Sequence, residues 1–506
     1  MLISFRKIIF LIKDNPILSI FYLVFYFTII YLAFTLNIWE DELYSLNTSS
    51  KSLSYAFNQS LVFEAQPPAY FISLTLWRSV SNSIIWARLF SVLIIFLSQI
   101  VLFLVIREVA DKKIAKIFSV LFLLNPIVIF SILEIRLYSL IILLTLLILY
   151  KFFNSYYRNK VTYVGRSVFV IISIFGVFTQ FFIGFILFAN AIVLLFEKKY
   201  RELKIYILDM ALPLFLLLLF IPYIRSSIGL HDSLLPPENY TLIEFSTLIA
   251  KLFMLKTYNY LLPFDFELPG IIYWVFRIGI IILFLLSLDV SYYRSIVKRM
   301  LPFIILSLVI YLFFTVVYFL FGTSYSQNKY SLVLFVPLFV SLAIIFKYIK
   351  SSYLYVWIVL FAALYLVNSI RQFPGLYKHK DYKSVCMYIY NHDENGKPVF
   401  AFRNVSAEIL NLYYKGNTTV YPIPDKFSYT DEFSSRQWTI ESNDLEKLSK
   451  IISQDSSFYV IIDDSPLSGF KESKSKLKMY LQKSFELEKE ISFGNELFLY
   501  EYTTKK

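Results

Sequence analysis

Three consecutive carboxylates, Glu40, Asp41 and Glu42, follow directly after the first long apolar stretch of the chain. A charge at the edge of a hydrocarbon layer is costly, and it commonly marks a site for a substrate, an ion or a proton. A carboxylate there could act as a general base towards an acceptor hydroxyl or amine. The alternative is a solvated cap on a membrane-spanning helix, because charges near the end of a span reach the interface at little cost.

A second polar segment, Gln66-Pro67-Pro68-Ala69-Tyr70, precedes the moderately apolar stretch 71–77. Proline lacks a backbone donor and restricts the residue before it, so the paired prolines fix a bend. We expect a re-entrant or interfacial helix that begins here and turns back towards the membrane. A plain turn before a buried helix is the other interpretation.

Cations lie near the ends of the later apolar stretches. Arg78 and Arg88 flank the start of the next stretch, where a cation requires an anion. Lys329 and Tyr330 lie near the end of a later stretch. Lysine can also extend to the interface there without any function.

The segment Glu134-Ile135-Arg136-Leu137-Tyr138 separates two short apolar stretches. If it is helical, Glu134 and Tyr138 share a face and Arg136 points elsewhere. Arg136 is then free to bind a lipid phosphate or a carboxylate of the first acidic segment. A structural Glu–Arg pair that holds the two stretches together is the alternative.

Together these residues have a chemical logic. A carboxylate deprotonates an acceptor, while Arg and Lys stabilise the phosphate that leaves when a sugar departs from a lipid carrier. The pair Asp41 and Glu42 could hold a divalent metal, but the pattern does not imply one, because a base requires none and the further oxygen ligands of a Mg²⁺ or Ca²⁺ site are missing. No cofactor is required.

The composition predicts an integral membrane protein, since 58% of the 506 residues are apolar and only 17% are charged. The net charge of +12 comes mostly from short loops between apolar stretches, so no nucleic-acid partner is indicated. The single cysteine, Cys386, excludes an intramolecular disulfide. The histidines (His231, His379, His392) have no metal-ligand spacing.

The apolar stretches predict the membrane topology. The first, which ends at Leu36, reads as a retained signal anchor with a cytoplasmic N-terminus. The others lie at roughly 84–106, 117–133, 137–153, 167–181, 182–196, 205–224, 271–288, 300–321, 330–346 and 353–370, which makes about 11 crossings. Basic loops fall on alternate turns, so the positive-inside rule places the loop 38–83 outside the plasma membrane. A single bent helix over 167–196 would invert everything downstream.

Residues 372–506 are rich in Lys, Asp, Glu, Ser and Asn, unlike the apolar residues 1–371. We expect a polytopic α-helical membrane domain followed by a soluble extracytoplasmic α/β domain. Apolar runs at 398–402, 458–462 and 497–500 predict strands, and the spacing at 405–414 and 443–453 predicts helices.

The ordered set of motifs resembles the GT-C membrane glycosyltransferases, in particular the group of protein O-mannosyltransferases and lipid A aminoarabinose transferases. Asp41-Glu42 looks like the acidic loop motif of that group, and Gln66-Pro67-Pro68-Ala69-Tyr70 is similar to its His/Lys-Pro-Pro-Leu-Tyr segment. Ala87-Arg88-Leu89-Phe90-Ser91 resembles its Arg-Leu-x-Ser element. The segment 134–138 is similar to its Glu-Ala-Arg-x-Tyr element, and Lys329-Tyr330 to its late Arg-Tyr.

The resemblance implies an inverting sugar transfer from a polyprenyl-phosphate-linked donor to a lipid, glycan or protein acceptor of the cell envelope. It implies Asp41 as the base and Glu42 as an assisting or orienting group. The donor phosphate would be bound by Arg88, Arg136 and Lys329, with support from Gln66, Pro67, Pro68, Tyr70, Glu134, Tyr138 and Tyr330. Two residues depart from the pattern of the group: Gln66 stands where a charged residue or histidine is usual, and Gln180 where a histidine-rich turn is common.

Two other classes of function compete with this one. A transporter or flippase of a lipid-linked sugar would require ionisable groups in the middle of spans, whereas nearly all of them lie at span ends. A noncatalytic scaffold that presents the soluble domain would leave Asp41, Arg136 and Lys329 unexplained.

Overall fold

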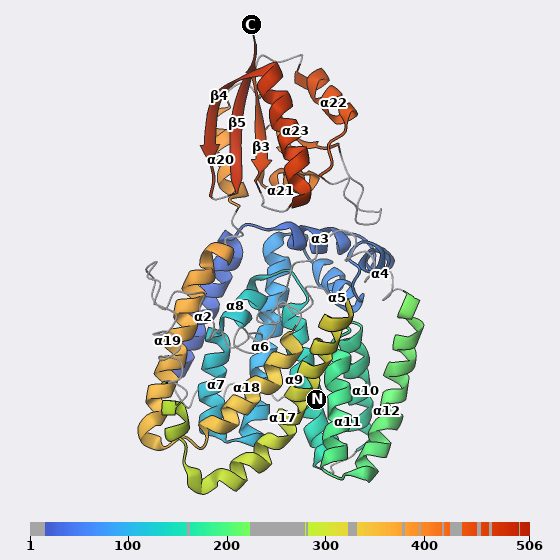
Figure 1. Cartoon of the computed structure of the whole chain (residues 1–506), viewed down its shortest axis with the longest axis vertical. Coiled ribbons are helices and arrows are strands. Elements are labelled where there is room, and N and C mark those ends of the chain that lie inside the picture. Colours follow the sequence, from blue (N-terminus) through green and yellow to red (C-terminus); the bar gives the residue numbers. More distant parts are fainter. Residues whose placement is uncertain are drawn as a thin grey trace.

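The computed structural model describes residues 16–158, 162–222, 279, 282–321, 331–376, 380–393, 396–416, 419–425, 438–452, 457–464, 468–494 and 496–505. A bundle of long helices forms the larger part, and a smaller domain built on a sheet is stacked on one end of it (Figure 1). The predicted fold class, a polytopic helical membrane protein with a C-terminal α/β domain, is confirmed. The predicted span 271–288 and the pair Lys329–Tyr330 lie largely or wholly outside the described residues.

The bundle is built from apolar helices, several of which are long enough to cross a bilayer. They are α2 (Pro16–Thr35), α6 (Ile84–Val109), α7 (Lys112–Leu124), α8 (Pro126–Leu133), α9 (Tyr138–Phe152), α10 (Tyr163–Val177), α11 (Ile183–Phe196), α12 (Tyr200–Leu219), α17 (Tyr293–Phe321), α18 (Leu332–Phe346) and α19 (Ser351–Leu376). A π-helical turn, η1 (Phe153–Tyr157), continues α9, and a short 3₁₀ turn, η2 (Val290–Tyr292), precedes α17.

Within the described residues, five helices are long and apolar enough to cross a membrane, or six if the bent pair α7 and α8 counts as one. Three apolar helices, α10, α11 and α18, are shorter. The stretches predicted at 167–181 and 182–196 form two separate helices, α10 and α11, rather than one bent helix. The full count of about 11 stays a prediction.

The bend between α7 and α8 has an identifiable cause. The two helices meet at 60° where Asn125 precedes Pro126. Proline cannot donate to the preceding turn, and the Asn125 side chain instead accepts a hydrogen bond from the Ile127 backbone N–H at 2.9 Å. Beyond the break, the carbonyl oxygen of Glu134 accepts a hydrogen bond from Ser91 of α6 at 2.6 Å.

Three short helices lie across the end of the bundle that faces the sheet domain (Figure 1). They are α3 (Glu40–Thr48), α4 (Leu53–Val62) and α5 (Ala69–Arg78). A helix begins directly after Pro68, as expected from the paired prolines, and is α5. The acidic triplet forms the first turn of α3, where negative charge is favoured by the helix dipole.

The C-terminal domain is a five-stranded sheet with strand order β2-β1-β3-β5-β4. Its strands are β1 (Val399–Phe402), β2 (Val420–Ile423), β3 (Ser457–Asp463), β4 (Phe485–Ser492) and β5 (Leu497–Thr504). Strands β2, β1 and β3 run parallel, whereas β5 pairs antiparallel with β3 and β4. The predicted strands correspond to β1, β3 and β5.

Helices cover both faces of this sheet. The helices are α20 (Tyr382–His392), α21 (Asn404–Tyr413), α22 (Ser442–Ile452) and α23 (Ser468–Ser484). Phe400 and Phe402 of β1 pack with α22 and α23, whereas Val399 and Ala401 belong to the apolar core that includes α20 and α21. That second core continues into the helical bundle, so the domain is joined to the bundle through packed side chains.

The expected domain boundary at 371/372 falls inside α19, which ends at Leu376. Beyond it, Lys383 of α20 donates to the carbonyl oxygens of Thr35 at 2.7 Å and Leu36 at 3.1 Å. A cation at the C-terminal end of a helix satisfies carbonyls that have no partner within the helix. The C-terminal domain therefore fixes the end of α2, immediately before the acidic triplet.

Candidate active site

The three carboxylates of the triplet each face a different arginine. Successive helical residues are rotated by about 100°, so neighbours on α3 point in different directions. Glu42 pairs with Arg88 of α6, Asp41 lies near Arg136 of the turn 134–137, and Glu40 pairs with Arg403 of the C-terminal domain. The triplet is thus the place where three distant parts of the chain meet.

The Glu42–Arg88 pair is completely buried, with both side chains at 0% exposure and an Nη2–Oε2 distance of 3.1 Å. All five N–H groups of Arg88 have acceptors in the protein: two go to Glu42 and three to the backbone carbonyls of Ala33, Leu36 and Asn37. Glu42 also accepts hydrogen bonds from the backbone N–H groups of Ile135 and Trp39. Arg88 has no donor left for a phosphate in this arrangement.

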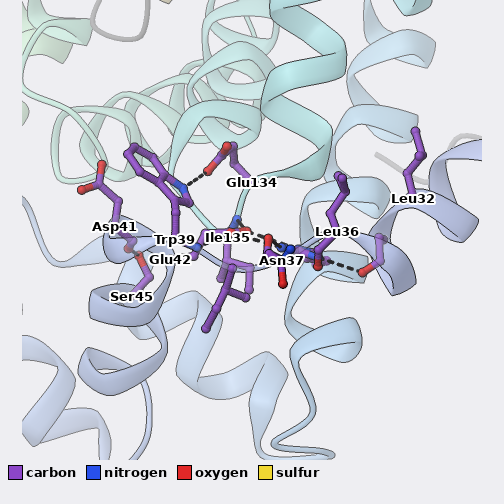
Figure 2. A network of polar contacts seen from close by, with 12 residues as sticks. Leu32, Leu36, Asn37, Trp39, Asp41, Glu42, Ser45, Glu134 and Ile135 are labelled. Carbon is purple, nitrogen blue, oxygen red and sulfur yellow. Dashed lines mark hydrogen bonds and ion pairs between the residues drawn. The ribbon is translucent and has the colours of Figure 1, made fainter. Parts of the chain in front are cut away.

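The carboxylate of Asp41 points away from this buried network (Figure 2). Its side chain is 25% exposed, and its Oδ2 lies 3.9 Å from Nε of Arg136. Arg136 also donates through Nη1 to Glu64 Oε2 at 2.9 Å and to Ser45 Oγ at 3.0 Å. Its buried Nε has no hydrogen-bond partner among the described residues. Arg136 therefore pairs with carboxylates of the first loop, which is one of the two partners expected from the sequence.

Glu64 completes this cluster. Its side chain is 3% exposed, and burial raises its pKa, although Arg136 acts in the opposite direction. Thr48 donates to its Oε1 at 3.3 Å. Sequence reasoning missed Glu64, and its position two residues before Gln66-Pro67-Pro68 is the only local signal that could have suggested it.

The segment 134–137 is a turn, so the face shared by Glu134 and Tyr138 in a helix does not form. Glu134 is instead buried and accepts a hydrogen bond from the indole Nε1 of Trp39 at 2.7 Å (Figure 2). Tyr138 is buried at the start of α9 and stacks on Phe130. Both side chains connect the turn to its surroundings.

The proline segment lies against the turn that follows α10. Pro67, Pro68 and Tyr70 are buried, and the Ala69 N–H donates to the carbonyl oxygen of Phe178 at 2.8 Å. This contact brings together the segments of Gln66 and Gln180, the two departures from the family pattern. The buried Gln66 Oε1 and Tyr70 hydroxyl have no hydrogen-bond partner in the described part of the chain. They are polar atoms that a substrate could satisfy.

The C-terminal domain contributes a cluster that the sequence did not predict. Arg403 contacts Glu40 and donates to Asp463 Oδ2 at 3.0 Å, and Lys380 lies 2.7 Å from the same oxygen. Burial alone would raise the pKa of Asp463, but Lys380 and Arg403 outweigh it, and the pKa is lowered. Arg403 directly follows β1 and Asp463 is the last residue of β3, so both lie at the carboxyl ends of adjacent parallel strands, where the ligand crevices of α/β sheets form.

Among the described residues, no group of three or more His, Cys, Asp or Glu side chains is arranged to hold a metal ion. Asp41 and Glu42, the pair considered for a divalent ion, point in different directions, and Glu42 is fully engaged with Arg88. The site as described is one of paired charges.

No family model matches the chain, and no curated protein matches it. Several solved structures, in contrast, resemble this chain in fold. The crystal structure of ArnT from Cupriavidus metallidurans in the apo state covers 97% of this chain and 98% of its own, with a TM-score of 0.57 and 11% identity. The same ArnT bound to undecaprenyl phosphate gives a TM-score of 0.53 at 10% identity, over 95% of this chain and 97% of that one.

The chain is therefore a multi-pass membrane protein with the GT-C fold. More particularly, it shares the architecture of ArnT along nearly its whole length, the C-terminal sheet domain included. The fold expected from the motifs is confirmed.

Proposed function

We propose that this protein is a glycosyltransferase that moves a sugar, with inversion, from a polyprenyl-phosphate-linked donor to an envelope lipid, glycan or protein. The observation that supports this proposal most directly is the position of Asp41. Asp41 is a partly exposed carboxylate that lies 3.9 Å from Arg136. ArnT, which has a similar fold, was crystallised with undecaprenyl phosphate bound. A base and a cation that can stabilise a leaving phosphate thus lie together.

Within this proposal, Asp41 takes the proton of the acceptor while Arg136 faces the departing phosphate. The unpartnered Nε of Arg136, the Gln66 amide oxygen and the Tyr70 hydroxyl supply further polar contacts. Glu42 and Arg88 act by positioning the first turn of α3 rather than by touching substrate. Lys329 keeps its predicted role at the donor phosphate and Tyr330 its supporting role, and Glu134, Tyr138, Pro67 and Pro68 shape the surrounding walls.

We place the site on the outer face of the plasma membrane, with the N-terminus in the cytoplasm and the C-terminal domain outside. The support is the distribution of basic loops described above. The reaction requires no metal in this scheme, because a carboxylate base acts directly on the acceptor.

The test is sugar transfer from polyprenyl-phosphate-sugar donors to total membrane acceptors by purified protein. Asp41→Asn should lower the rate by roughly 10²- to 10⁴-fold, because the amide cannot accept the proton. Glu108→Gln, which breaks an ion pair with Arg158 at the other end of α6, is the matched control and should transfer normally. Full activity of Asp41→Asn would refute the assigned base. Translocation of the donor by a wild type that transfers no sugar would instead establish the flippase.

A further inference from the structure

A polar pocket lies at the turn between α3 and α4, against the C-terminal end of α5. Its volume is about 370 Å³, within the range of small-ligand sites. The polar side chains that line it include serine hydroxyls and two cations: Ser49, Ser50, Ser52, Ser79, Lys51 and Arg78. None of them has a role in the proposed transfer.

Arg78 is a buried charge without a carboxylate partner in the part of the chain that the structure describes. The residue is 7% exposed, and its Nη1 donates to the Leu46 carbonyl and to Ser49 Oγ, while its buried Nε has no acceptor among the residues that the structure describes. Arg88, Arg136 and Arg403 each pair with at least one carboxylate. Buried guanidinium groups are otherwise rarely left without an anion.

The carbonyl of Leu46 belongs to the last turn of α3, and the C-terminal end of a helix carries only partial negative charge. Burial lowers the pKa of Arg78, which is the direction expected for a charge short of stabilising partners. The surroundings of Arg78 therefore compensate only part of its charge.

The other side of the pocket also favours an anion. It is formed by the N-terminal end of α4, where Ser52 caps the helix by accepting from the Tyr55 N–H at 3.2 Å. The N–H groups of a first helical turn and the positive end of the helix dipole attract phosphate. Lys51 adds a cation next to this turn, and the serine hydroxyls can donate to phosphate oxygens.

We propose that this pocket binds a phosphate group, held between Arg78, Lys51 and the N-terminus of α4. Leu53 and Leu76 line the same pocket and are 44% and 57% exposed, which fits a phosphate carried by a lipid. Asp41 and Ser49 are joined by α3 and lie about 12 Å apart at the helical rise of ~1.5 Å per residue. A lipid bound here would lie about one length of α3 from Asp41, and its binding does not depend on the proposed transfer.

The experiment is native mass spectrometry of the full-length protein in detergent, titrated with phosphatidylglycerol and, separately, with diacylglycerol of the same chain length. Wild type should bind phosphatidylglycerol and bind diacylglycerol much more weakly. Arg78→Gln should weaken phosphatidylglycerol binding roughly tenfold, and Lys51→Ala by a smaller factor, because each removes a charged donor to phosphate. Arg107→Gln, an exposed cation at the far end of α6, is the control and should bind like wild type.

A free-phosphate arm distinguishes the source of the phosphate. Displacement of phosphatidylglycerol by millimolar glycerol phosphate would show a phosphate site that soluble ligands also reach, whereas resistance would show that the lipid chains are required. Because Arg78 also caps α3 and its substitution could unfold the protein, the exposed Lys51 keeps the test decisive. Equal binding of phosphatidylglycerol by wild type and Lys51→Ala, equal binding of both lipids, or an equal loss in Arg107→Gln would overturn the proposal.

Discussion

Asp41 and Glu42 are adjacent in sequence, yet they lie in opposite environments. Glu42 is fully buried, and its two oxygens are bonded to Arg88 and to backbone N–H groups. Asp41 is 25% exposed and 3.9 Å from Arg136, whose own Nε has no hydrogen-bond partner among the described residues. The difference separates a buried carboxylate that stabilises the fold from the partly exposed one that we propose as the base.

The three acidic residues 40–42 serve three different purposes although they are consecutive in the chain. The same helical turn directs Glu40 to the C-terminal domain, Asp41 towards Arg136 and Glu42 into the core of the bundle. The rotation between successive residues, not their chemical type, assigns these roles.

The largest effect should come from Glu42→Gln. Removing one partner of a buried ion pair leaves the charge of Arg88 uncompensated, so we expect the free energy of unfolding to fall by about 3–5 kcal/mol. Thermal unfolding in detergent measures this change. Glu108→Gln, on the partly exposed pair with Arg158 at 2.6 Å, is the control and should cost less than about 1 kcal/mol. A Glu42→Gln protein as stable as the control would erase the distinction between the two carboxylates.

An intermediate effect should follow Arg403→Gln, which cuts the tie between Glu40 and Asp463. We expect a loss of about 1.5–3 kcal/mol at neutral pH, the range for hydrogen bonds to charged groups. Since the pKa of Asp463 is lowered, its contribution is present above the ordinary Asp pKa and is lost as the pH falls through the folded value. The difference in the free energy of unfolding between wild type and Arg403→Gln should therefore become smaller at acidic pH.

Lys397→Gln is the matched control for Arg403, because it breaks the Lys397–Glu501 pair within the C-terminal domain without touching α3. Thermal unfolding from pH 3 to 8 should show a smaller, flatter loss for this control. If the stability loss caused by Arg403→Gln became larger at acidic pH, the assigned pairing of Arg403 with Asp463 would be contradicted.

The smallest effect should come from Glu64→Gln, which tests the Asp41 side of the comparison. Arg136 keeps a second carboxylate, Asp41, at 3.9 Å, and the amide oxygen of glutamine can still accept from it, so we expect the free energy of unfolding to change by about 1 kcal/mol or less. Because burial raises the pKa of Glu64, wild type loses stability as the pH rises from the ordinary Glu value, about 4.3, through the raised folded value. Glutamine does not titrate, so Glu64→Gln should become more stable relative to wild type as the pH rises over that range.

Unfolding midpoints of wild type and Glu64→Gln between pH 4 and 8 measure this difference. The sign is opposite to that for Asp463, and parallel trends in the two experiments would show that the local environments have been assigned incorrectly.

Much of the architecture could be predicted because it depends on local patterns. The apolar stretches became helices within a few residues of their expected limits, as for α6 and α18, and three strands of the sheet followed from short apolar runs. The helix α20, the strands β2 and β4 and the helix α23 were not predicted. Strand β4 is largely exposed and charged, so its hydropathy does not mark it as part of a sheet.

By itself, the sequence determined that the chain is a membrane protein, where most of its described helices run, and that Arg136 could pair with a carboxylate of the acidic loop. Only the tertiary structure decided which arginine each carboxylate meets, that Arg88 has no donor to spare, and that Arg403 reaches Glu40. The physical reason is range. Hydropathy and helical periodicity act between near neighbours, whereas the contact of residues 363 positions apart exists only after both domains have packed.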